Sequence, residues 1–226
     1  MAVAVKICGI RTPEAALAAA EAGADLIGLV FAPSKRRVDA ATAWNIVDAL
    51  RSSVHGRDMT VVGVFVDDGP EHIMNVATAV GLDWVQLSGH EPVEVAAAID
   101  RPSVKALRFD GNPSEAAWLQ SDPGCDVVPV LIDAHVQGSF GGAGVIADWE
   151  AARRVAATRP VLLAGGLTPS NVAAAIAAVR PWGVDVSSGV ETDGVKDLDK
   201  IRAFVCAAKT GVPTPRETIP GRSLPM

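Results

Sequence analysis

The chain has 226 residues, of which 49% are hydrophobic and 20% are charged, and its formal net charge is −6. This composition suits one large α/β domain, and the acidic balance argues against a nucleic-acid partner, which requires a basic stripe. No apolar run reaches transmembrane length, and the three cysteines, Cys8, Cys125 and Cys206, have no metal-binding or redox spacing. We therefore expect a cytoplasmic protein with no membrane partner and no metal site.

Short β-branched segments alternate with alanine-rich helical segments along the chain. The expected strands cover residues 3–7, 25–31, 60–66, 84–87, 103–107, 127–132, 161–164 and 183–186. The expected helices cover residues 13–22, 40–51, 70–80, 92–99, 112–119, 148–157, 169–178 and 197–208. Thr12 is expected to cap the first helix, with Pro13 at its first position and Gly23 at its end.

Eight strands that each precede a helix predict one α/β domain, a (β/α)8 TIM barrel over residues 1–210. The strands are apolar throughout, as in a parallel sheet that is buried on both faces. A doubly wound open sheet is the alternative, but it usually has five to seven strands and an early GxGxxG turn, which this chain lacks. The proline-rich segment 211–226 is expected to be irregular, either as a frayed tail or as a lid.

Two turns of small residues follow the last two expected strands. Gly165 and Gly166 follow one strand, and Ser187-Ser188-Gly189 follow the strand that contains Asp185. Glycine lets backbone N–H groups approach a ligand closely, and serine adds hydroxyl donors. Such turns after strands 7 and 8 of a barrel commonly bind phosphate, so we expect a small phosphorylated substrate.

Cys8 and Asp133 are the candidate catalytic residues, because each stands at the carboxyl end of an expected strand. Cations near Cys8 would lower its pKa and make it a usable base, although a lone cysteine is often only a buried apolar residue. An apolar environment would raise the pKa of Asp133 and make it an acid near neutral pH, the alternative being a capping or ion-pairing role.

Three further groups of residues are candidates for substrate binding. Arg36 and Arg37 belong to a basic run after the second strand, where arginine suits a carboxylate, although such runs are usually solvated. Gln86 lies in the fourth strand, at the expected mouth of the barrel. Gly142 and Gly144 lie in the glycine-rich loop 137–145, which is either a ligand-binding or closing loop or an ordinary flexible one.

Eight blocks along residues 3–208 together resemble the phosphoribosylanthranilate isomerase family of tryptophan biosynthesis. These blocks are Lys6–Ile10, Ala22–Asp25 with Val30–Pro33, Val62–Val66, Val85–Leu87, Leu131–Ala134, Gly141–Gly144, Ala164–Leu167 and Asp185–Glu191. The resemblance implies a cofactor-independent Amadori rearrangement of a small phosphorylated aromatic aminosugar, N-(5′-phosphoribosyl)anthranilate.

The resemblance also implies roles for the candidate residues. Asp133 would be the general acid that opens the ribose ring, and Cys8 the general base that removes the C2′ proton. Either Arg36 or Arg37 would hold the anthranilate carboxylate. Gln86 would line the site, and the glycine and serine turns would hold the phosphate.

The chain departs from the family pattern at three places. Ser88 stands where the family usually has histidine, Val38 stands where it usually has tyrosine, and Ala143 and Val145 replace a hydroxyl residue and a lysine. These departures leave two alternatives open: a related aminosugar-phosphate isomerase with altered aromatic specificity, and a non-catalytic phosphate-ligand binder. Either a monomer or a homodimer is compatible with the sequence.

Overall fold

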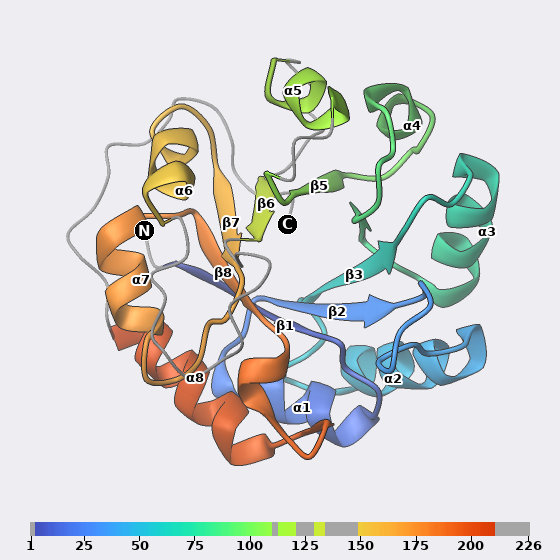
Figure 1. Ribbon diagram of the computed structural model, residues 1–226. Helices are drawn as coiled ribbons and strands as arrows, with labels where there is room; N and C mark the ends of the chain where they lie inside the picture. Colours follow the sequence, from blue (N-terminus) through green and yellow to red (C-terminus); the bar gives the residue numbers. More distant parts are fainter. Residues whose placement is uncertain (1–2, 110–112, 121–128, 134–148, 211–226) are drawn as a thin grey trace.

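A closed barrel of eight parallel strands forms the centre of the computed structural model, which describes residues 3–109, 113–120, 129–133 and 149–210 (Figure 1). The strands are β1 (Ala4–Cys8), β2 (Leu26–Val30), β3 (Thr60–Phe65), β4 (Trp84–Leu87), β5 (Ser103–Leu107), β6 (Val130–Asp133), β7 (Val161–Ala164) and β8 (Gly183–Val186). Pairing of β1 with β8, from Ala4 opposite Gly183 to Ile7 opposite Val186, closes the barrel. The predicted TIM barrel is confirmed, and the doubly wound sheet is excluded.

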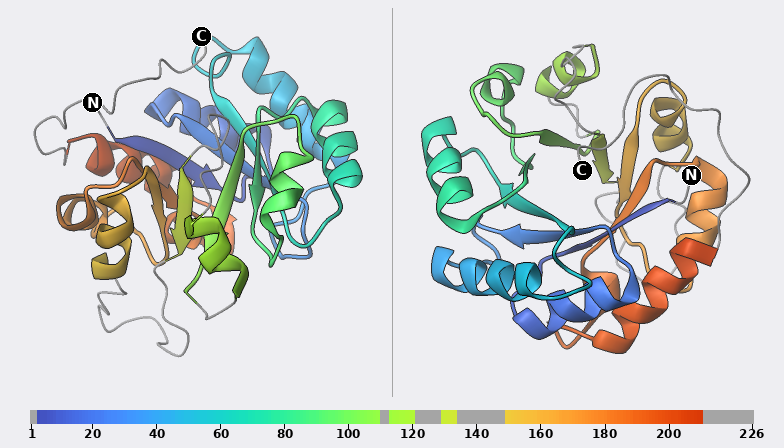
Figure 2. Two further views of the ribbon diagram at one scale, coloured as in Figure 1. Left: turned by 90° about the horizontal axis from the view of Figure 1, so that it is seen from above. Right: turned by 180° about the vertical axis from the view of Figure 1, so that it is seen from behind.

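In the described part of the chain, eight helices surround the barrel, one after each strand (Figure 2). They are α1 (Pro13–Ala22), α2 (Ala40–Ser52), α3 (Pro70–Val80), α4 (Val93–Ala97), α5 (Pro113–Gln120), α6 (Trp149–Ala156), α7 (Val172–Val179) and α8 (Leu198–Thr210). The start and end of α1 confirm the sequence prediction. The Thr12 hydroxyl accepts a hydrogen bond from the Ala15 amide at 3.3 Å, and Gly23 ends the helix at φ 88°.

Helix α7 begins three residues later than the predicted start at Pro169, so that boundary was wrong. The side chain of Asn171 accepts a hydrogen bond from the Thr168 amide at 2.8 Å and donates one to the Gly166 carbonyl at 3.0 Å. These two bonds close a turn over residues 168–171, and the turn leads the chain away from the barrel mouth before the helix starts. Asparagine side chains commonly replace backbone partners in this way.

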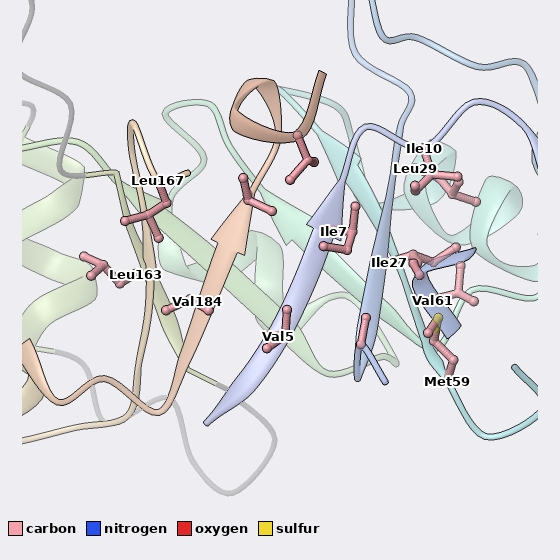
Figure 3. Close-up of a cluster of buried hydrophobic side chains, with 14 of the residues drawn as sticks. Val5, Ile7, Ile10, Ile27, Leu29, Met59, Val61, Leu163, Leu167 and Val184 are labelled. Atoms are coloured by element: carbon pink, nitrogen blue, oxygen red, sulfur yellow. The ribbon is translucent and has the colours of Figure 1, made fainter. Parts of the chain in front are cut away.

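The main hydrophobic core lies between the barrel and the helices. Val5, Ile7, Ile27, Leu29 and Val61 are fully buried there (Figure 3). Each such side chain stabilises the fold by about 1.5–3 kcal/mol relative to exposure. Side chains alternate between the two faces of a strand. Because Val5 and Ile7 point outward to the helices, Lys6 and Cys8 point into the barrel.

A short hairpin after β8 was not predicted. A 3-10 turn, η2 (Ser188–Val190), leads into β9 (Glu191–Thr192), which pairs with β10 (Val195–Lys196). Asp193 and Gly194 form the turn between them, with φ values of 51° and 77°. Positive φ at both central residues favours Asp-Gly in two-residue hairpins, so this pair was the sequence signal.

Among the helices that the structure describes, none is both long and apolar enough to span a membrane. The predictions for loop 137–145, with Gly142 and Gly144, and for segment 211–226 concern residues outside the described ranges. The first part of the predicted strand 127–132 also lies outside them. The described part, β6, ends at Asp133.

Candidate active site

A buried lysine lies beneath Cys8 inside the barrel. Cys8 ends β1 and is 8% exposed, and Lys6, two residues earlier on the same side of the strand, is 1% exposed. The Lys6 ammonium donates hydrogen bonds to Asp185 Oδ1 and to Gln86 Oε1, each at 2.9 Å. Lys6 thus joins β1 to β8 and β4 across the interior of the barrel.

Gln86 links this ion pair to Ser88. The Gln86 amide donates to Ser88 Oγ at 2.9 Å, and both side chains are buried. The buried polar chain therefore runs from Asp185 through Lys6 and Gln86 to the serine that departs from the family pattern. Val38, another departure, is buried in the main core rather than lying at the mouth.

Gly28 of β2 makes room for Cys8 and Lys6. A Cβ atom on Gly28 would lie 2.8 Å from Cys8 Sγ and 3.2 Å from Lys6 Nζ. The Cys8 thiol and the Lys6 ammonium therefore both border the space that a side chain at position 28 would occupy. A glycine inside a strand often marks such a close approach, and this one explains the interruption of an apolar strand.

Burial raises the pKa of the Cys8 thiol above its ordinary value. The positive charges of Lys6 and Lys196 act in the opposite direction, and the negative charge of Asp185 adds to the rise. The sequence-based expectation of a lowered thiol pKa was therefore wrong for the net effect. The expected cations are present, but the cost of burying the thiolate exceeds their effect.

A second ion-pair cluster lies at the mouth, where Arg36 meets the hairpin. Arg36 Nε and Nη2 donate to the two carboxylate oxygens of Glu191 at 2.7 and 2.8 Å. The Lys196 ammonium donates to Glu191 Oε1 and to the Ser187 carbonyl, both at 2.8 Å. Hydrogen bonds from Arg36 and Lys196 hold the pKa of Glu191 at about 2, against the opposing effect of burial.

The two candidate arginines differ in position. The Arg36 side chain crosses Gly9, directly after Cys8: a Cβ atom on Gly9 would lie 2.5 Å from Arg36 Cδ and 3.2 Å from Ser187 Oγ. Arg37 is exposed, and its backbone amide bonds to the Ser34 carbonyl. Arg36 is therefore the arginine that lies among Cys8, the hairpin and the serine turn.

The turns after β7 and β8 contact each other. Gly165 and Gly166 have φ values of 90° and 64°, which favour glycine. A Cβ atom on Gly189 would collide with the Leu167 carbonyl oxygen, so the Ser187-Ser188-Gly189 turn packs directly on the turn after β7. The two predicted phosphate-binding segments are thus brought together.

Asp133 is the last residue of β6 and is partly exposed at the end of its strand. Its Cα pairs in register with Ala164 of β7, next to Gly165. In the closed barrel, β6 is separated from β1 by β7 and β8, so the two turns predicted to bind phosphate follow the strands between Asp133 and Cys8.

Sequence reasoning missed Lys6, Glu191 and Lys196 as members of the site. Closure of the barrel was the signal for Lys6, because it sets strand 1 beside the Asp185 strand. The described part of the chain contains no group of three His, Cys, Asp or Glu side chains placed to hold a metal ion.

A thiol, a carboxyl and glycine-rich turns lie at the carboxyl ends of the strands, where barrel enzymes have their active sites. The fold and these residues together define the class of protein: a (β/α)8-barrel enzyme. The family model for N-(5′-phosphoribosyl)anthranilate (PRA) isomerase matches residues 5–207. The chain belongs to the phosphoribosylanthranilate isomerase family, as its sequence motifs predicted, and is therefore an isomerase.

Relatives and solved structures agree with this assignment. An N-(5′-phosphoribosyl)anthranilate isomerase of Roseiflexus sp. (strain RS-1) is 56% identical over 208 residues, which cover 91% of this chain and 97% of the relative. The phosphoribosylanthranilate isomerase structure from Thermotoga maritima has a TM-score of 0.79 and 39% identity, covering 92% of this chain and 99% of its own.

Another solved phosphoribosylanthranilate isomerase structure, in complex with reduced 1-(o-carboxyphenylamino)-1-deoxyribulose 5-phosphate, is 38% identical to this chain. It has a TM-score of 0.74 and covers 92% of this chain and 99% of its own. A thiamine phosphate pyrophosphorylase from Pyrococcus furiosus, at 20% identity and a TM-score of 0.65, shares the fold alone.

Proposed function

We propose that this chain converts N-(5′-phosphoribosyl)anthranilate to 1-(2-carboxyphenylamino)-1-deoxyribulose 5-phosphate, the Amadori step of tryptophan biosynthesis. The observation that carries this proposal is the position of Cys8, which lies between a buried lysine and an arginine cluster beside the serine turn. The product-analogue complex of the relative at 38% identity supports the same phosphorylated ligand class.

The proposed reaction needs one acid and one base. Asp133 donates a proton to the ribose ring oxygen as the C1′–O bond breaks, and the aniline nitrogen lone pair forms the C1′ iminium. The Cys8 thiolate then removes the C2′ proton, which gives an enolamine. C1′ gains a proton and the C2′ hydroxyl loses one, so that a ketone forms at C2′ and the net change is an isomerisation.

Substrate binding is assigned to the two ends of the site. The backbone N–H groups of the turns at Gly165-Gly166 and Ser187-Ser188-Gly189 hold the phosphate. Arg36 holds the anthranilate carboxylate, because it lies beside Gly9 and the serine turn and a guanidinium suits a carboxylate. Its Nε and Nη2 bind Glu191, so Nη1 faces the substrate. Gly142 and Gly144 remain predicted contributors from the loop after β6.

Asp185 and Gln86 act from below the substrate through their bonds to Lys6.

The protein works in the cytoplasm as a monomer or homodimer, without nucleic-acid or membrane partners, and reducing conditions there keep Cys8 a thiol. One catalytic barrel domain spans residues 1–210. One solved relative from Thermotoga maritima is described as a dimeric enzyme converted to monomers.

Complementation tests this function in cells. Expression of the chain in a tryptophan auxotroph that lacks this isomerase is expected to restore growth without tryptophan, and Cys8→Ala or Asp133→Ala is expected to abolish the rescue. Failure by well-expressed, folded wild-type protein would contradict the proposal. Binding of the product analogue by that protein without turnover would instead favour a non-catalytic binder.

A further inference from the structure

A lysine inside a barrel is an unusual feature that the ion pair itself does not explain. Lys6 and Asp185 are both buried, and their separation of 2.9 Å satisfies the two charges. Buried ion pairs are nonetheless often no more stabilising than apolar residues of the same volume, because both charges lose their hydration. The placement of the pair beneath Cys8 indicates a use other than stability.

The charged groups around Cys8 come from four elements. Lys6 of β1 and Asp185 of β8 lie below it, Lys196 of β10 lies above, and Arg36 lies in the loop after β2. Strand β2 contributes uncharged residues, Gly28 and Val30, beside Cys8. Three of these four groups are cations, and the Glu191 carboxylate of β9, which pairs with both Arg36 and Lys196, adds a second negative charge nearby. Cys8 therefore lies in a buried environment in which three cations outnumber two carboxylates, and these cations oppose the effect of burial on the thiolate.

Lys6 is the nearest of these cations inside the barrel, and its position is fixed. Its ammonium is held by Asp185 and Gln86, and Gly28 leaves open the space between this ammonium and Cys8 Sγ. Lys196 is likewise fixed by Glu191 and the Ser187 carbonyl, with a side chain that is 4% exposed. Neither charge needs to reorganise when a thiolate forms.

We propose that Lys6 and Lys196 are positioning residues that stabilise the thiolate of Cys8 from below and from above, and so maintain the base form on which the proposed isomerisation depends. This inference rests on the proposed function of Cys8. Burial raises the pKa of the thiol, and each lysine counteracts that rise. Removal of either lysine therefore decreases the fraction of protein that carries a usable base.

The pH dependence of Cys8 alkylation tests this proposal without reference to turnover. Iodoacetamide reacts with the thiolate, and peptide mass spectrometry separates Cys8 from Cys125 and Cys206. Lys6→Met and Lys196→Met are expected to move the midpoint of the Cys8 profile to higher pH. If the midpoint rises by about one pH unit, alkylation at pH values below it slows about tenfold. An unchanged or lowered midpoint in both variants would overturn the inference.

Two further variants serve as controls. Lys200→Met removes an exposed lysine that bonds to the Glu191 carbonyl, and it is expected to leave the midpoint unchanged. Lys6→Met leaves Asp185 without its lysine partner and risks misfolding, so Lys6→Met/Asp185→Asn removes both buried charges together. Its midpoint is still expected to rise, because Lys6 affects the thiol more strongly than Asp185 does. A fall in this double variant would contradict the assignment to Lys6.

Failure of the inference is distinguishable from failure of the proposed function. Loss of turnover in Cys8→Ala together with unchanged midpoints in both lysine variants would retain the base and reject the lysines' role. Raised midpoints together with full turnover in Cys8→Ala would reject Cys8 as the base, and with it the functional purpose that we assign to the lysines.

Discussion

Arg36 and Glu191, which are 155 residues apart in the chain, form a two-point ion pair at the mouth of the barrel, with N–O distances of 2.7 and 2.8 Å. Bidentate pairs of this kind fix geometry as well as charge. The pair joins the loop after β2 to the hairpin after β8. It therefore connects the proposed carboxylate site to the proposed phosphate site.

The pair predicts a specific dependence of stability on pH. Because the pKa of Glu191 is lowered from 4.5 to about 2, its stabilising effect is present above about pH 4.5 and is lost as the pH falls toward 2. Glu191→Gln is therefore expected to unfold more easily than wild type at pH 7, with a difference that narrows between pH 4.5 and 2. Urea unfolding across this range measures it, and a difference that is constant with pH would contradict the lowered pKa.

Arg36 and Arg37 are distinguished by paired substitutions. Arg36→Lys retains the charge but loses the planar fork. It is expected to lower kcat/KM by roughly 10- to 100-fold, because hydrogen bonds to charged groups contribute about 1.5–3 kcal/mol. Arg37→Lys, at an exposed position, is expected to have kcat/KM close to that of wild type. Steady-state kinetics with the anthranilate substrate make the comparison, and the opposite order of effects would assign the carboxylate to Arg37.

The contact between the two proposed phosphate turns predicts that Gly189 does not tolerate a side chain. Gly189→Ala would push the serine turn away from the Leu167 carbonyl, so that KM and the dissociation constant of the product analogue are expected to rise. Gly69→Ala is the matched control, because no heavy atom lies within 4 Å of its added Cβ. Equal analogue affinities for both variants would show that the turns do not hold the phosphate.

The proposed acid and base predict losses in kcat. Cys8→Ala and Asp133→Asn are each expected to lower kcat by roughly 10²-fold or more, the usual scale for a lost general acid or base. Analogue binding is expected to change far less, because the phosphate turns and Arg36 remain. A variant with wild-type kcat would remove its residue from the proposed mechanism.

The barrel was predictable because its signals are local. Apolar strands alternate with alanine-rich helices along the chain, Thr12-Pro13 starts α1, and glycine ends α1 and α3. The strand ends indicated Cys8 and Asp133 as candidates. The α7 boundary was missed because the Asn171 side chain closes a turn that resembles a proline-initiated helix start. The predicted direction of the Cys8 pKa was wrong because burial depends on packing in three dimensions, which the residue type does not reveal.

The ion pairs of the site were harder to predict because they join distant parts of the chain. Lys6 and Asp185 are 179 residues apart, and their contact follows only once the barrel closes between β1 and β8. Glu191 and Lys196 lie on two-residue strands, which are too short to show a periodic pattern. Only the Asp-Gly pair between those strands indicated the hairpin.

Carbon-13 NMR of the purified protein tests the central claim most directly. The substrate and the product are isomers of equal mass, but only the product has a ketone at C2′, so substrate labelled at that carbon reports conversion. Wild-type protein is expected to produce the ketone signal, and Cys8→Ala and Asp133→Ala are expected to slow it sharply. Absence of the ketone signal with folded wild-type protein would contradict the account.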